Sequence, residues 1–360
     1  MFEERVEPNV NELIDIIVNK GTGKRVHFIE LFLDEEIKEM VCRRYGIGAS
    51  INPNAPFAAL QKDIELYQFL GYDIFWVAGH HKDVFSFDMI STEDTTTEEK
   101  QARDNREWMN EHVGIIQTWE DYEKYKWPRI ADVDFGMFEW MDRNLPENMG
   151  CYDLTSHILE IVLYLFGYEA MCYKLFDEPL LVDAVFEKVG QFYVDYTRSL
   201  CDFSSVKIIW GSDDLGFKTG TLISANDIRT KVLPWHKKCA QIAHEHNRPY
   251  LLHSCGNLDE IMDDLIETVK IDGRHSYEDA IMPVTDFKKQ YGNRVAVLGG
   301  IDIDFLCRAD EKAIRRRVRN TLEQCIPSGG YCLGTGNTVA NYIPVNNYLT
   351  MLDEGRRFQF

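Results

Sequence analysis

Eight short apolar runs recur along the chain and end at Gly, Asp, His or Cys residues, a pattern typical of buried β-strands. Between most of these runs, apolar residues return at helical spacing, which predicts amphipathic helices such as 228–246, 258–269 and 311–325. The predicted strands are residues 26–31, 73–78, 149–154, 206–211, 250–255, 271–275, 295–300 and 331–334.

Strand and helix alternate eight times, and this alternation is the signature of a (β/α)8 barrel. We therefore predict an α/β fold in which residues 1–360 form a single TIM-barrel domain with an N-terminal extension. Residues 80–148 interrupt the alternation and carry Trp108, Trp119 and Trp127, so we expect a long excursion after the second strand that acts as a lid. The most apolar run, 158–166, is far shorter than the roughly 20 residues of a membrane span and predicts a buried helix.

Composition narrows the class of protein further. Hydrophobic residues make up 45% and charged residues 27% of the chain, as in an ordinary soluble domain. The formal charge of −20 argues against nucleic acid or an anionic membrane as partner. The first residues are acidic and lack a signal-peptide pattern, and nine cysteines are scattered without a disulfide framework. These features predict a cytoplasmic protein with free thiols.

Polar residues gather at the predicted carboxyl ends of the strands, where a (β/α)8 barrel carries its active site. This gathering identifies the strand ends as the expected site of chemistry. The residues found there are Glu30, His80, His81, Tyr152, Asp153, Asp213, Asp214, His253, Cys255, His275, Glu278, Asp302 and Cys332.

His253 and Cys255 are two residues apart on a predicted strand, so their side chains share one face. Cys332 stands in a second apolar run that ends in glycines and is expected to reach the same rim. An imidazole and two thiolates with an open fourth position fit a catalytic zinc site better than a structural one. Glu278, just past the sixth strand, is a candidate fourth ligand, although such a residue is also often a plain surface carboxylate. The alternative for the other three is a buried histidine with two inert core cysteines.

Other motifs carry weaker signals. Asp213 and Asp214 follow the fourth strand and suit either acid–base catalysis or a helix-capping turn. Glycines at 299–300 and 334–336 follow the last two strands and suit phosphate, but the candidate ligand Cys332 beside them disfavours it. His236, Cys239 and His244 share one helical stretch and are expected to pack or face solvent. The sequence has no nucleophile elbow, P-loop or dinucleotide fingerprint.

Four segments resemble the uroporphyrinogen decarboxylase superfamily and, within it, the zinc-dependent, corrinoid-linked methyltransferases. The resemblance runs from about residue 30 to 357, and it implies that His253, Cys255 and Cys332 bind zinc with Glu278 at the spacing of a further ligand. No Arg-rich motif occurs around residues 25–45, which sets the chain apart from the porphyrinogen decarboxylases proper. The four segments are Gly211-Ser-Asp-Asp-Leu-Gly216, His253-Ser-Cys255-Gly-Asn257, Gly299-Gly-Ile-Asp302 and Gly330-Tyr-Cys332-Leu-Gly334.

The resemblance implies methyl transfer, and two directions are open. One moves methyl from a small aromatic methyl ether to the cob(I)alamin of a separate corrinoid protein, with zinc as Lewis acid at the ether oxygen. The other moves methyl from a corrinoid protein to a thiol of the coenzyme M type. Two thiolates and a carboxylate would leave zinc net negative and favour the thiol, whereas the tryptophans of residues 80–148 suit a phenyl ring.

We expect O-demethylation of a small aromatic methyl ether by a zinc-containing, cytoplasmic homodimer that docks a corrinoid protein. A metal-free decarboxylase and a binding module stapled by zinc are the remaining alternatives. We assign catalysis to Asp213, Asp214 and Glu278 and metal binding to His253, Cys255, Cys332 and Glu278. We assign substrate binding to Glu30, His80, Tyr152, Asn257, His275 and Asn337.

Overall fold

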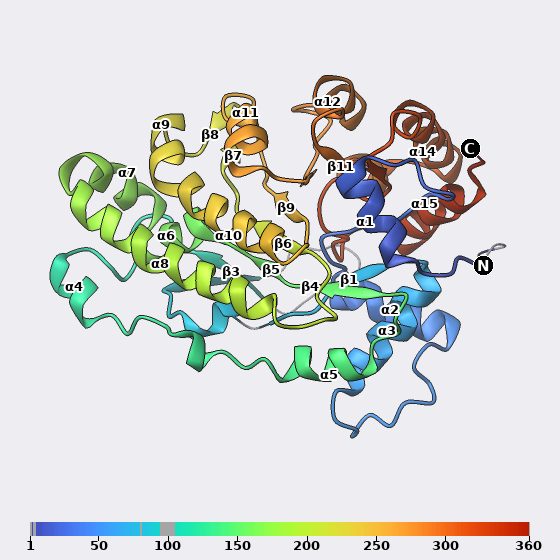
Figure 1. The fold of residues 1–360 in the computed structure, drawn as a ribbon, viewed down its shortest axis with the longest axis horizontal. Coiled ribbons are helices and arrows are strands. Elements are labelled where there is room, and N and C mark those ends of the chain that lie inside the picture. Colours follow the sequence, from blue (N-terminus) through green and yellow to red (C-terminus); the bar gives the residue numbers. More distant parts are fainter. Residues whose placement is uncertain (1, 3–4, 80, 94–104, 360) are drawn as a thin grey trace.

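The strands form a ring of parallel segments with helices packed around it (Figure 1). The computed structural model describes residues 2, 5–79, 81–93 and 105–359. β1 (Ile74–Trp76) pairs with β4 (Gly150–Tyr152), and the other strands of the ring make one continuous parallel sheet. The order of that sheet is β5 (Leu154–Thr155), β6 (Ile209–Ser212), β9 (Tyr250–His253), β10 (Gly273–His275), β11 (Ala296–Leu298) and β12 (Tyr331–Cys332).

The first predicted strand closes the ring. Phe28 forms a parallel bridge with Leu333 of the last strand, so the sheet continues past β12 to the start of the chain. On the other side of this segment, the side chains of Arg25 and His27 contact Asp73 at the foot of β1. A bridge from Cys151 to Val206 joins β4 to the start of β6. These links complete eight strand positions and confirm the predicted (β/α)8 barrel.

Helices follow the strands, as the alternation predicts. The predicted helix over 311–325 is α14 (Glu311–Cys325), and the short apolar run is the buried helix α6 (Ile158–Phe166). Two predicted helices contain π-helical turns, η3 (Ile228–Val232) before α10 and η4 (Leu265–Val269) after α11. The remaining helices are α1 (Val10–Asn19), α2 (Glu35–Tyr45), α3 (Ala58–Leu70), α5 (Gly136–Asn144), α7 (Tyr168–Asp177), α8 (Pro179–Leu200), α9 (Ala225–Asp227), α10 (Leu233–Glu245), α11 (Met262–Asp264), α12 (Val284–Tyr291), α13 (Ile303–Arg308) and α15 (Val345–Arg357).

The predicted N-terminal extension contributes α1, which packs against the barrel interior from below. Leu13, Ile16 and Ile17 of α1 belong to the same buried apolar cluster as Leu298 and Cys332 of the last two strands. Because bulky side chains fill the lower barrel, this end is a packed core. The chemistry is therefore confined to the opposite mouth.

The segment predicted as an excursion contains a hairpin and four helices, α5 among them, within its described residues. The hairpin pairs β2 (Met89–Glu93) with β3 (Asn105–Met109), and η1 (His81–Val84), α4 (Trp119–Lys124) and η2 (Ile130–Asp132) lie around it before α5. A second small hairpin follows β6 and pairs β7 (Gly216–Phe217) with β8 (Gly220–Thr221). Trp108 and Trp119 are exposed, so neither forms a buried wall of the mouth. His80 lies outside the described residues.

Among the residues that the structure describes, no helix combines the length and the apolar character needed to cross a bilayer.

Candidate metal centre

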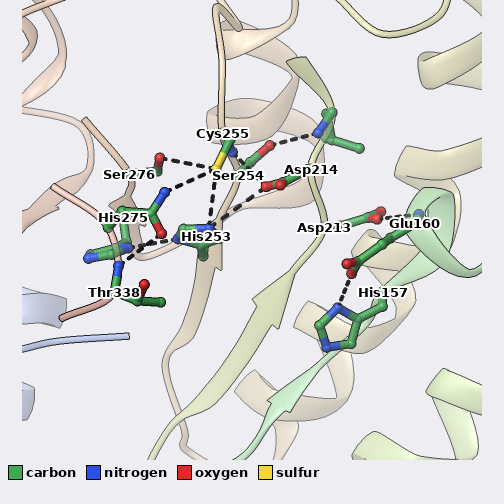
Figure 2. A network of polar contacts seen from close by, with 12 residues as sticks. His157, Glu160, Asp213, Asp214, His253, Ser254, Cys255, His275, Ser276 and Thr338 are labelled. Atoms are coloured by element: carbon green, nitrogen blue, oxygen red, sulfur yellow. Dashed lines mark hydrogen bonds and ion pairs between the residues drawn. The ribbon is translucent and has the colours of Figure 1, made fainter. Parts of the chain in front are cut away.

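His253, Cys255 and Asp214 meet at the mouth of the barrel (Figure 2). His253 ends β9, Cys255 lies on the loop that follows, and Asp214 follows the end of the neighbouring β6. His253 Nε2 lies 3.6 Å from Cys255 Sγ and 3.7 Å from Asp214 Oδ1. Asp214 Oδ1 also accepts a hydrogen bond of 2.8 Å from the backbone N–H of Cys255, which fixes the carboxylate beside the sulfur.

Two of the three spacings between these atoms fit ligands of one zinc ion, and all three atoms lie within 4.8 Å of one another. With bonds of about 2.1 Å to nitrogen and oxygen and about 2.3 Å to sulfur, tetrahedral geometry separates neighbouring donor atoms by about 3.4 to 3.6 Å. The two measured separations, 3.6 and 3.7 Å, are close to these values. The Asp214 side chain is 47% exposed, so one side of the group is open to solvent. A group with three ligands and an open side matches a catalytic rather than a structural zinc site.

Neighbouring polar groups orient the sulfur and the imidazole. Ser276 Oγ and Asn337 Nδ2 lie 3.6 and 3.3 Å from Cys255 Sγ, in position to donate hydrogen bonds to it. His253 Nδ1 and His275 Nδ1 are 2.8 Å apart, and one ring donates to the other. A second hydrogen bond of this kind commonly holds a metal-binding histidine in its tautomer.

Burial sets the protonation of the group. Burial lowers the pKa of His253, which favours the neutral imidazole that a metal binds. Burial and the neighbouring Asp214 raise the pKa of the Cys255 thiol well above its usual range. Because a bound divalent cation favours the thiolate, metal binding at this group would release a proton.

Cys332 does not join this group. The pairing of the last strand continues past β12, since Thr335 bridges Ile301 and the backbone N–H of Ile301 donates to the carbonyl of Gly334. Cys332 therefore lies three residues below the end of that pairing, fully buried beside the residues of α1. Asn337, five residues further along the chain, is the residue of this segment that contacts Cys255. The apolar run alone did not reveal how far the strand continues.

Asp213 and Asp214 point in opposite directions, as consecutive residues of an extended chain do (Figure 2). Asp213 is fully buried and accepts hydrogen bonds of 2.9 Å from the backbone N–H groups of Leu159 and Glu160 at the start of α6. His236 Nε2 lies 2.9 Å from Asp213 Oδ2, the oxygen that also accepts from Leu159. Asp213 thus ties α6 and α10 to β6, and only Asp214 belongs to the candidate metal group.

Two other predicted residues lie beside the group without joining it. Glu278 is exposed on the loop after β10, and the group of possible metal ligands within the described residues does not include it. Asn257 Oδ1 accepts a hydrogen bond from the backbone N–H of Asp259, so this amide caps the turn after β9. Both residues line a small surface pocket next to Ser276.

Glu30 and Tyr152, predicted to bind substrate, are buried in strand contacts. The Glu30 carboxylate accepts hydrogen bonds from the backbone N–H and the hydroxyl of Thr335, at 2.9 and 2.5 Å. The Tyr152 hydroxyl donates to the carbonyls of Glu30 and Leu31, at 2.5 and 2.9 Å. These bonds join the first strand segment to its neighbours, which gives both residues a role in closing the barrel.

Replacing Glu30 with glutamine is expected to flatten the pH dependence of stability. Burial raises the pKa of Glu30 from 4.5 to about 8, so the folded protein holds this proton more tightly than the unfolded chain. The contribution of Glu30 to stability should therefore be greatest below pH 4.5, fall as the pH rises to about 8, and then level off. Within that window, wild type should lose about 1.4 kcal/mol per pH unit relative to Glu30→Gln. Urea unfolding across the window measures this, and parallel curves for the two proteins would contradict it.

Sequence reasoning missed a buried hydrogen-bond network at the mouth, the Asp153 hub, in which Trp76, His81 and Tyr196 contact the Asp153 carboxylate. The Asp153 carboxylate accepts hydrogen bonds from the indole N–H of Trp76 at 3.0 Å and the hydroxyl of Tyr196 at 2.5 Å. It also accepts one from the backbone N–H of Leu154 at 2.9 Å. His81 Nδ1 lies 3.0 Å from the same carboxylate. Asp153 and His81 were identified as strand-end residues, but no local pattern linked them to Tyr196, which comes from the distant helix α8.

The fold and the site define a (β/α)8 barrel with a possible metal group at its catalytic mouth. The model of the uroporphyrinogen decarboxylase (URO-D) family matches residues 158–358, more than half of the chain. The chain therefore belongs to this family. The matched region contains His253, Cys255 and Asp214.

One solved structure shares this architecture, and a second gives a weaker superposition. A methyltransferase from Methanosarcina mazei superposes with a TM-score of 0.71 at 14% sequence identity, covering 98% of both chains. A protein assigned as a vitamin-B12-independent methionine synthase from Listeria monocytogenes gives a TM-score of 0.49 at 11% identity, again covering 98% of both chains. A search of curated proteins found no match. At these identities the first likeness establishes the fold that the chain shares with a methyltransferase.

Proposed function

We propose that this protein is a zinc-dependent methyltransferase that demethylates a small aromatic methyl ether and passes the methyl group to the cob(I)alamin of a corrinoid protein. The observation that carries the proposal is the group of His253, Cys255 and Asp214 at the open mouth of the barrel. The family and the fold shared with a methyltransferase are consistent with it.

The donor set favours the ether over the thiol as reactant. His253, Cys255 and Asp214 would hold the zinc, and the fourth position is left for the substrate oxygen. One thiolate and one carboxylate balance the two positive charges of zinc, so the site would be neutral, whereas two thiolates and a carboxylate would make it negative. Bound there, zinc would supply Lewis acidity to the ether oxygen. A neutral site is the better Lewis acid, because each added anion competes for the positive charge.

The chain's own residues hold this group in place. Ser276 and Asn337 reach Cys255 Sγ, and hydrogen bonds of this kind draw negative charge from the thiolate. His275 fixes the His253 ring through the contact between their Nδ1 atoms. In the proposed reaction the methyl–oxygen bond breaks, its electron pair stays on the aryl oxide, and that oxide takes a proton to leave as a phenol. The methyl group forms its new bond to the cobalt of cob(I)alamin.

The corrinoid protein would dock over the strand ends, because only this mouth exposes the metal group. The exposed Asp214 lies on the side from which a partner can approach. The helix-covered lower end, filled by the side chains of α1, offers no such access. We propose a homodimer as the assembly that presents this mouth.

A methyl-transfer assay tests the proposal directly. Full-length protein is incubated with guaiacol (2-methoxyphenol) and cob(I)alamin, and formation of methylcobalamin is followed by absorbance. A parallel reaction supplies methylcobalamin and 2-mercaptoethanesulfonate. Both are repeated after dialysis against a chelator and again after zinc is restored.

Methylcobalamin formation that disappears with the chelator and returns with zinc is the expected result. Methylation of the thiol in the parallel reaction, without ether cleavage, would overturn the proposed direction. A third reaction replaces guaiacol with vanillate, which carries a carboxyl group as well as the methyl ether. Chelator-insensitive release of CO2 from vanillate, with no methyl transfer, would overturn the proposed chemistry altogether.

A further inference from the structure

A second feature of the barrel mouth is a cavity of about 370 Å³ at the ends of β1 and β5. Phe32 and Trp76 form one wall, with ring centroids 4.9 Å apart and planes inclined by 39°. His81 and His157 also line the cavity, and their rings are stacked with centroids 5.5 Å apart. The volume is near the lower end of the range for small-molecule sites, which suits a ligand of one ring rather than a tetrapyrrole.

The aromatic wall is held rigidly. The indole N–H of Trp76 donates to the buried Asp153 carboxylate at 3.0 Å, and Asp153 is fixed in turn by Tyr196 at 2.5 Å. A wall that is fixed before the ligand arrives loses little conformational entropy on binding. The hub thus prepares a flat surface at the cavity.

Gly79 shows how tightly this hub is built. A Cβ at this position would lie 2.1 Å from the Tyr196 hydroxyl and 2.4 Å from Asp153 Oδ2. The backbone therefore approaches the two hydrogen-bonded groups as closely as only glycine permits. Gly79 lines the cavity as well, so the hub and the cavity are parts of one structure.

The cavity lies at the same end of the barrel as the candidate metal group, and one strand, β6, stands between β5 at the cavity and β9 at the metal group. β5, whose end lines the cavity, pairs with β6, and β6 pairs with β9, which carries His253. Lys82 lines the cavity, and its Nζ donates to Glu160 Oε2 at 3.3 Å. The backbone N–H of Glu160 donates in turn to Asp213, which precedes Asp214 in the chain. Figure 2 shows His157 and Glu160 on the side of Asp213, across β6 from His253 and Cys255.

We propose that this cavity is the seat of a single flat aromatic ring, which stacks on Trp76 and Phe32 while its methoxy group faces the metal group. The orientation of the methoxy group rests on the proposed function, whereas binding of the ring in the cavity does not depend on it. None of the residues that line this cavity was predicted to bind substrate from the sequence, where Trp108, Trp119 and Trp127 were favoured as the aromatic surface instead.

Calorimetric titration of the full-length, chelator-treated protein tests the seat without turnover. Guaiacol is titrated first, and 2-methoxycyclohexanol serves as a saturated control of similar size. Two variants remove the seat in different ways: Trp76→Leu deletes the aromatic wall, and Ala78→Leu fills the cavity while leaving the Asp153 hub intact. Trp119→Leu is the matched control, because Trp119 is an exposed tryptophan of α4 and does not line the cavity.

Guaiacol should bind wild type and Trp119→Leu at least about tenfold more tightly than the saturated control, and both seat variants should lose that preference. Equal affinity for the two compounds, or guaiacol binding to Ala78→Leu as tight as to wild type, would overturn the seat. Failure of methyl transfer with ring binding intact would overturn the proposed function and leave the seat standing. Full turnover of guaiacol by Ala78→Leu would overturn the seat alone.

Discussion

Cys255→Ala is expected to abolish stoichiometric zinc binding and, with it, methyl transfer. Cys255 is the sulfur of the group formed with His253 and Asp214, and the two remaining donors cannot hold a catalytic zinc at the usual count of three protein ligands. Loss of even an outer-shell partner costs about 10- to 100-fold in metal affinity, so loss of a direct ligand should cost at least about 100-fold. Metal analysis of purified protein and competition with a chromophoric chelator measure both quantities.

Cys332→Ala is the matched control, because it removes a sulfur from the lower barrel core instead of from the mouth. This variant should retain zinc and lose on the order of 1 kcal/mol of stability through the small cavity that it leaves. If Cys332→Ala loses zinc as Cys255→Ala does, the ligand set inferred here is wrong and the one predicted from the sequence is right.

Substitution of the two adjacent aspartates is expected to separate stability from metal binding. Asp213→Ala should lower the free energy of unfolding by about 3 kcal/mol or more, because it leaves the backbone N–H groups of α6 and the buried His236 without their acceptor. Asp214→Ala should change stability by less than about 1 kcal/mol, since its side chain is half exposed, but should weaken zinc binding about 100-fold or more.

Urea unfolding of the metal-free proteins and zinc titration of the folded ones give the two readouts separately. Asp213→Asn keeps the shape of the side chain and should recover part of the lost stability. Zinc affinity that falls equally in Asp213→Ala and Asp214→Ala, with stability unchanged in both, would show that the pair acts as one site and would contradict the division of roles.

The fold was largely predictable because the barrel repeats one local pattern. All eight predicted strands correspond to segments of the ring, and α14 has the predicted bounds. Buried parallel strands are almost wholly apolar, which makes them stand out from amphipathic helices. The hairpin of β2 and β3 has no such signature, because β2 is largely exposed.

The site was predictable only in part. The face shared by His253 and Cys255 follows from strand periodicity, and the structure brings both to one place. The depth of Cys332 depends on how far its strand continues its pairing with β11, which no local pattern records. The same holds for Asn337, which reaches Cys255 across 82 positions of the chain.

The sequence by itself determined the barrel, the mouth at which polar residues collect and the pairing of an imidazole with a thiol, because period-two and helical repeats are local properties of the chain. Tertiary structure alone decided that Asp214 lies beside that thiol and that Cys332 is buried in the lower core. It also decided how Trp76, Asp153 and Tyr196 assemble beside a cavity. Those contacts join distant segments, and their geometry depends on strand register and tilt around the closed ring.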